Sequence, residues 1–247
     1  MQRKIFIYGL ILGAALLLNT PVHAQSKEQV IAAYLEKIAN YIKWNEEKVL
    51  EDNVFTIAVI GDLYMCDIIK DAYQKLSWHA LLFGNEQQFL FYKKQCKQKG
   101  QTIVGSDKSA LKEAEANERP NPTLLKSRLL FDGGYYQQAY DLLRQKDKNH
   151  FKHERFQLEY SYRMGRITHA LQQYAKALQY YHDTIDEGRD ATWYFACRAA
   201  LEQGKIYETL QHTAAAKKAY QNCLSIKPDE HKTGLHHQAK AGLSRLE

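Results

Sequence analysis

The feature that most constrains the fold is a spacing of small and large residues that recurs three times in the second half of the chain. Each occurrence begins with a small residue, and a second small residue stands twelve positions later. A large apolar residue stands four positions after the second small residue. The three sets are Ser127, Ala139 and Leu143; Gly165, Ala177 and Tyr181; and Gly204, Ala216 and Tyr220. Small residues let two helices approach closely, and the large residue fills the space beside them. The spacing therefore predicts three helical hairpins with a period of 38 to 39 residues.

The last of these units carries two further markers. Tyr207 follows Gly204 by three residues, and Pro228 stands where it would end the second helix. With these markers the pattern resembles the tetratricopeptide repeat family over residues 122–247. The resemblance implies a mainly α fold, a right-handed superhelix of hairpins in which the first helix of each unit lines a concave face.

Two details adapt this pattern to the present chain. The period exceeds the 34 residues that are usual for the family, so we expect the extra residues in the connections at 146–149 and 187–190. A final helix with one apolar face is predicted over 230–246. Such a helix would cap the last apolar surface of the array.

A basic residue follows the first small residue of every unit: Arg128, Arg166 and Lys205. If the units superpose, these side chains form one row along the concave face. One helical turn earlier lie three apolar residues that we expect to accept side chains of an extended peptide: Leu124, Tyr162 and Leu201. Guanidinium and ammonium groups suit carboxylates. The predicted partner is therefore a protein or peptide, recognised through an acidic segment or a free C-terminus.

The first 24 residues predict export. Arg3 and Lys4 precede an apolar run. Small residues follow this run, and the last of them, Ala24, stands directly before Gln25. The apolar run is shorter than the ~20 residues that a membrane-spanning helix requires. We therefore expect cleavage of a signal peptide near Ala24 and a periplasmic or secreted chain without stable membrane insertion.

A small α/β segment is predicted over residues 25–77. Apolar periodicity indicates helices over 26–44 and 66–76, and β-branched residues indicate one strand over 54–62. Through the runs AAYLEKIANYIKW and FTIAVIGD the segment resembles the YfiR-like family of periplasmic proteins. The resemblance implies a regulator of an inner-membrane diguanylate cyclase. Three alternatives stay open for the strand. It pairs with a second strand at 102–104, it pairs with a strand of another chain, or it lies in a loosely packed region and has no partner strand.

Between these halves, residues 78–121 are predicted to form a helical connector. The stretch 76–94 has helical apolar spacing around a Gly-Asn turn, which suggests a further hairpin without the small-residue signature.

No set of residues predicts catalysis, a metal or a cofactor. The pair His150 and His153 has helical spacing but lacks the carboxylate or cysteine that would complete a ligand set. The four cysteines are widely spaced and are interpreted as small buried apolar residues, although Cys197 and Cys223 could approach each other within one hairpin. A net charge of +6 is too small and dispersed to favour nucleic acid.

These observations favour a protein without enzymatic activity, an exported helical-repeat scaffold that holds a protein or peptide partner in the bacterial cell envelope. The alternative is a YfiR-like periplasmic regulator of an inner-membrane signalling enzyme.

Overall fold

The computed structural model describes residues 70–102, 105–116 and 119–247, and in these ranges the chain is mainly helical, as predicted. They contain ten α-helices, one short 3-10 helix (η3) and no strand. The elements are α3 (Lys70–Leu82), α4 (Glu86–Gln98), α5 (Gly105–Glu115), α6 (Pro122–Asp132), α7 (Tyr136–Leu143), η3 (Lys148–His150), α8 (Glu154–Ala170), α9 (Tyr174–Gly188), α10 (Phe195–Thr209), α11 (Thr213–Ser225) and α12 (Lys232–Arg245). The predicted signal peptide (1–24), helix (26–44) and strand (54–62) lie outside the described residues.

The described residues belong to two compact units. The first holds 70–75, 92–102 and 105–115, and the second holds 76–91, 116 and 119–247. In the first unit the Lys70 ammonium donates to the backbone carbonyls of Cys96 at 2.8 Å and Lys99 at 3.0 Å. These bonds satisfy carbonyl groups at the C-terminal end of α4.

The boundary predicted near residue 77 lies close to the division between the two units at 75/76, and it falls within a helix, because α3 continues without interruption to Leu82. No proline or glycine stands between Lys70 and Leu82, so nothing in the chain stops the helix earlier. The break comes at Gly84, whose φ is +72°. The helix predicted over 66–76 and the first helix of the hairpin predicted over 76–94 are therefore parts of one helix, α3.

Hairpins α6/α7, α8/α9 and α10/α11 are closed by the same three-residue turn. The middle residue of each turn has a positive φ, +83° at Gly134, +58° at Gln172 and +59° at Gln211. The next residue donates its backbone N–H to a carbonyl five residues earlier, at 2.8 Å in all three turns. This bond satisfies a carbonyl that the end of the first helix leaves open.

The α3/α4 hairpin ends in the same way, which confirms the hairpin predicted over 76–94. Asn85, after Gly84, donates its N–H to the carbonyl of Ala80 at 2.9 Å. Ser77 stands seven residues before Gly84 and is buried, as is the first small residue of each later unit. Phe89 takes the place of the second small residue, so the signature is half present here.

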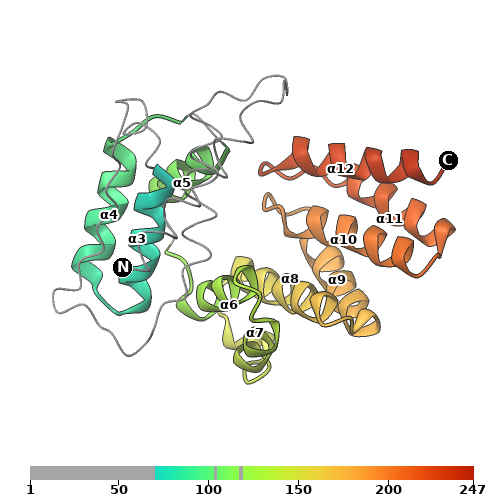
Figure 1. Ribbon diagram of the computed structural model, residues 1–247, viewed down its shortest axis with the longest axis horizontal. Helices are drawn as coiled ribbons and strands as arrows, with labels where there is room; N and C mark the ends of the chain where they lie inside the picture. The colour runs from blue at the N-terminus through green and yellow to red at the C-terminus, as the bar shows by residue number, and fades with distance from the viewer. Residues whose placement is uncertain (1–69, 103–104, 117–118) are drawn as a thin grey trace, which may run out of the picture. The chain divides into compact units, whose positions relative to one another are not determined.

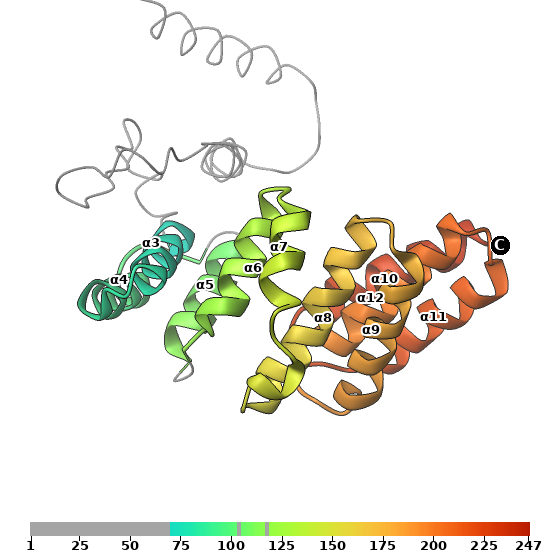
Figure 2. The same cartoon turned by 90° about the horizontal axis from the view of Figure 1, so that it is seen from below.

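We call α6, α8 and α10 the A helices and α7, α9 and α11 the B helices. Each B helix packs against its own A helix and against the helix that follows it in the chain. α8 also packs against α6 and α10, and α10 against α12. The hairpins therefore follow one another in chain order (Figures 1 and 2).

The predicted contacts between small and large residues are confirmed in the second and third hairpins. A Cβ atom added to Gly165 would lie 2.6 Å from Cδ1 of Tyr181, and one added to Gly204 would lie 2.3 Å from Cε1 of Tyr220. Each tyrosine thus packs directly on the backbone of the facing helix. The second small residues of the three units are fully buried: Ala139, Ala177 and Ala216.

The predicted capping helix is present as α12, and it uses the same tyrosine. A Cβ atom added to Gly242 would lie 2.5 Å from Cε2 of Tyr220, which is the ring edge opposite to Gly204. The Tyr220 ring is therefore held between α10 and α12. Leu235 and Ala239 of α12 are buried in the same core.

Beyond the last hairpin, α11 ends at Ser225 and Ile226 is extended, so the helix stops before Pro228, which is buried. A proline disfavours helical backbone in the residue before it, in agreement with this ending. Tyr207 packs against the core from a partly buried position. The connections 144–153 and 189–194 are longer than the turns within hairpins. The first contains the predicted extra residues 146–149, whereas of the residues predicted at 187–190 the first two are the last residues of α9.

Candidate partner-binding surface

The three basic residues predicted to form a row occupy equivalent places. Arg128, Arg166 and Lys205 each stand six residues before the positive-φ residue of their turn. They lie on α6, α8 and α10, which pack in that order, and all three are partly exposed. Trp78 takes the same place in α3. The row therefore exists as a structural feature, and its use in binding stays a prediction.

Aromatic rings lie under two of these cations. The guanidinium carbon of Arg128 is 4.6 Å from the centre of the Trp78 ring, and that of Arg166 is 4.0 Å from the centre of the Phe131 ring. Arg128 also has its Nε 3.6 Å from the carboxylate of Asp132. Stacking on a ring occupies the face of a guanidinium group, while its N–H donors point outward in the plane. The rings thus hold both cations without using all of their donors.

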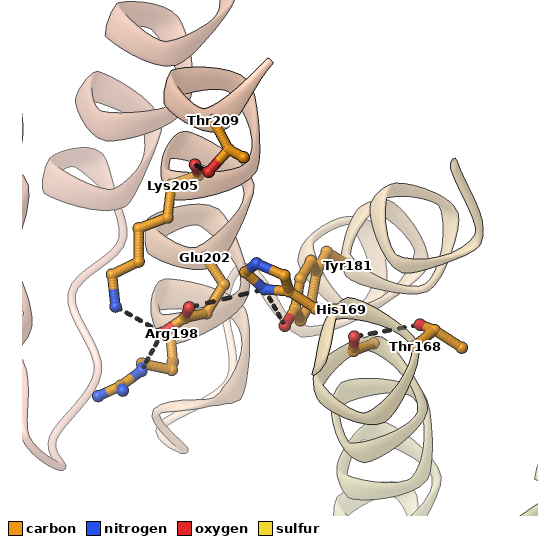
Figure 3. A network of polar contacts seen from close by, with 8 residues as sticks. Thr168, His169, Tyr181, Arg198, Glu202, Lys205 and Thr209 are labelled. Carbon is orange, nitrogen blue, oxygen red and sulfur yellow. Dashed lines mark hydrogen bonds and ion pairs between the residues drawn. The ribbon is translucent and has the colours of Figure 1, made fainter. Parts of the chain in front are cut away.

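The third cation, Lys205, belongs to a cluster around the buried carboxylate of Glu202 (Figure 3). Glu202 Oε1 lies 2.9 Å from Lys205 Nζ and 2.9 Å from Arg198 Nε, all on α10. Its Oε2 lies 3.9 Å from Nδ1 of His169, which projects from α8. The same nitrogen is 3.5 Å from the hydroxyl of Tyr181 on α9. The cluster therefore joins two hairpins.

Electrostatics in this cluster favour a charged Glu202 and a neutral His169. Burial opposes ionisation of Glu202, but Lys205 and Arg198 outweigh it and hold the pKa of the carboxyl below its usual value. Burial lowers the pKa of His169, and the nearby Glu202 carboxylate offsets only part of that effect. One of the two cations is thus balanced by Glu202, and the cluster keeps an excess of positive charge.

A second ion pair lies on α8, where Arg163 Nε donates to Glu159 Oε1 at 2.8 Å. Both side chains are largely buried. Burial opposes the charge on Arg163, but Glu159 outweighs it and raises the pKa of the guanidinium. Sequence reasoning missed this pair and the pair Arg198 and Glu202, although a spacing of four residues between opposite charges is a readable helical signal.

One part of the predicted groove is corrected by the structure. Leu124, Tyr162 and Leu201 are almost completely buried, with exposed fractions of 0%, 2% and 0%. They pack in the core of their hairpins, so they cannot accept side chains of a bound peptide. The residues three positions before the basic row, and not four, share its face: Leu125, Arg163 and Glu202.

The charge of this face is positive. Places 13, nine, six and two residues before the positive-φ residue fall on one side of each A helix. The charged residues at these places are Arg128, Asp132, Glu159, Arg163, Arg166, Arg198, Glu202 and Lys205. We call them the A-face residues, and cations outnumber carboxylates among them.

His153, which was considered as a metal ligand, and His236 both contact the backbone. His153 Nδ1 accepts the backbone N–H of Arg155 at 3.3 Å, and Nε2 of His236 is 2.9 Å from the carbonyl of Ile226. Among the residues that the structure describes, no group of three or more His, Cys, Asp or Glu side chains could hold a metal ion. In the same part of the chain, no helix combines the length and apolar character needed to cross a membrane.

In comparisons with known proteins, no family model matches the chain, and no curated protein matches it.

Proposed function

We propose that this chain is an exported, non-enzymatic scaffold of the bacterial cell envelope, a helical-repeat protein of tetratricopeptide type that binds an acidic segment of a protein partner along its A-face residues. In this proposal the hairpins form a right-handed superhelix and the A helices line its inner side. The export rests on the first 24 residues of the sequence. The observation that carries the binding proposal is the row of Arg128, Arg166 and Lys205 at equivalent places on successive A helices.

The form of the row supports an extended anionic ligand. Its cations come from three successive helices, so they can meet carboxylates that are spread along a chain rather than gathered in one small ion. Arg166 contributes a guanidinium held over Phe131, and such a group binds a carboxylate through two parallel N–H bonds. Because the interaction is electrostatic and near the surface, we expect added salt to weaken it.

The test uses fluorescence polarisation with a labelled peptide of alternating Glu and Leu residues. The same peptide with Gln in place of Glu is the ligand control. Arg166→Glu, in the middle of the row, should weaken binding of the acidic peptide by roughly tenfold or more. The matched protein control is Lys218→Glu, because Lys218 is an exposed residue of the B helix α11 and the charge change is the same. This control should bind within about twofold of the parent chain.

Two further measurements make the outcome unambiguous. Loss of the stacking on Phe131 should cost Arg166→Glu about 0.5–1 kcal/mol of stability, so its circular dichroism must match the parent chain at the temperature of the assay. Amidation of the peptide's C-terminus separates recognition of side-chain carboxylates from recognition of a free C-terminus. Equal binding of the acidic peptide by Arg166→Glu and Lys218→Glu would contradict the proposal.

A further inference from the structure

Two cysteines face each other inside the third hairpin. Cys197 lies near the start of α10 and Cys223 near the end of α11. Their sulfur atoms are 3.5 Å apart, and the Cys197 thiol is also 3.4 Å from the backbone carbonyl of Cys223. Both side chains are free thiols with an exposed fraction of 0%. The two sulfurs therefore touch, and no other group lies between them.

The position of this pair in the hairpin gives it a structural meaning. The turn at residues 210–212 closes one end of α10/α11. Cys197 and Cys223 lie at the opposite, open end, 26 residues apart in sequence. A bond between them would require the sulfurs to approach from 3.5 Å to about 2.05 Å, a movement of about 1.5 Å. The third described cysteine, Cys96, donates its thiol to the backbone carbonyl of Lys70 at 3.3 Å.

We propose that Cys197 and Cys223 form a disulfide bond that fastens the open end of the α10/α11 hairpin. The oxidant is a disulfide of low molecular weight or of an exchange protein, represented in the test by oxidised glutathione. One cysteine thiolate attacks the oxidant and releases one thiol, and the second cysteine then attacks the mixed disulfide and releases the other. The two cysteine sulfurs lose two electrons and two protons, and the oxidant takes up both to become two thiols.

Burial determines when this reaction takes place. The contact with Cys197 and the removal of water both raise the pKa of the Cys223 thiol. Both thiols have an exposed fraction of 0%, so a dissolved oxidant cannot reach either sulfur and exchange is slow once the hairpin has packed. The bond therefore forms while α10 and α11 come together, and the folded core then protects it from reductants. We expect oxidation to be much faster during refolding than in the folded, reduced chain.

The experiment is independent of partner binding and of export, so it fails or succeeds separately from the proposed function. The chain with Cys66→Ser and Cys96→Ser retains only the two facing thiols. It is unfolded and reduced, then refolded in a buffer of reduced and oxidised glutathione at a ratio of ten to one. The intact mass, the number of titratable thiols and the melting temperature are measured before and after reduction. The variant Cys197→Ala in the same background has one thiol and serves as the control.

The expected result is a mass lower by about 2 Da, no titratable thiol and a melting temperature that falls by roughly 10 °C on reduction, as for closure of a loop of this length. The melting temperature of the control should not depend on reductant. Two free thiols or glutathione adducts after refolding would overturn the proposal. A peptide map of the unsubstituted chain, refolded in the same buffer, decides the matter if the double variant does not fold. A peptide linking 197 to 223 supports the bond, and free thiols or other pairings at these positions refute it.

Discussion

Gly204→Ala should destabilise the protein, although the same exchange in most helices is stabilising. Alanine is favoured over glycine in a helix interior by about 1 kcal/mol. At Gly204, however, the added Cβ would lie 2.3 Å from Cε1 of Tyr220, whereas carbon atoms normally pack at about 3.5–4.0 Å. The ring has nowhere to move, because its other edge lies against Gly242.

The magnitude follows from these opposing effects. Relief requires either separation of α10 from α11 or a strained rotamer of Tyr220, and overpacking of this kind costs about 1–3 kcal/mol. The full block on ring movement places the cost near 3 kcal/mol, and the gain in helix propensity of about 1 kcal/mol offsets part of it. We therefore expect a net loss of about 2 kcal/mol, or about 4–8 °C in melting temperature.

Thermal and urea unfolding followed by circular dichroism measure this loss. Gly234→Ala is the matched control, because Gly234 is helical and a Cβ added there meets nothing within 4 Å. It should leave stability unchanged or raise it by up to about 1 kcal/mol. In a background of Tyr220→Leu the cost of Gly204→Ala should shrink, with a coupling energy above about 1 kcal/mol. If Gly204→Ala raises the melting temperature as Gly234→Ala does, the packing argument is refuted.

Three further predictions concern other parts of the hairpins. Ala216→Leu should cost roughly 1–3 kcal/mol in urea unfolding, because Ala216 is fully buried between α10 and α11; an unchanged midpoint would contradict the close approach of these helices. Burial lowers the pKa of His169 in the folded chain, so below about pH 6.5 the unfolded chain binds more protons than the folded chain, and the free energy of unfolding decreases as the pH is lowered. His169→Gln should reduce the difference in this free energy between pH 7.5 and 5.5, and an unaltered difference would exclude His169 as its source. Gln172→Gly should stabilise by about 0.5–1 kcal/mol, because Gln172 has a φ of +58°; a lower melting temperature would mean that contacts of the glutamine side chain outweigh its backbone strain.

The hairpins could be predicted from the sequence because the contacts that define them repeat at a constant spacing. Gly165 with Tyr181 and Gly204 with Tyr220 recur one period apart, and a recurring spacing is visible in one chain. Gly242 was missed because the described residues hold no helix after α12 that would complete the small-residue pattern. Ser77 was missed because Phe89 stands where the later hairpins have alanine.

The site was predicted only in part, for a geometric reason. The places of Arg128, Arg166 and Lys205 follow from the period alone. Which residues lie beside them depends on rotation about the helix axis. Relative to each basic residue, the side chain four positions earlier is rotated by about 40° about the axis, and the side chain three positions earlier by about 60° in the other direction. In this chain the residue four positions earlier lies in the core, as Leu201 does, and the residue three positions earlier lies on the charged face, as Glu202 does. Contacts such as Arg166 with Phe131 join separate helices and leave no local pattern to read.

The position of Tyr220 between two glycines has a consequence for how an array of this kind can grow. Gly242 follows Gly204 by 38 residues, so α12 takes the place of the first helix of one more repeat. The α10/α11 hairpin thus presents to α12 the same tyrosine ring that it would present to the first helix of a further hairpin. Copying the block from 204 to 241 in tandem would return the chain to an equivalent glycine at the join. Duplication or deletion of one period can therefore change the number of hairpins in the array, while each copy of Tyr220 keeps a glycine on either side.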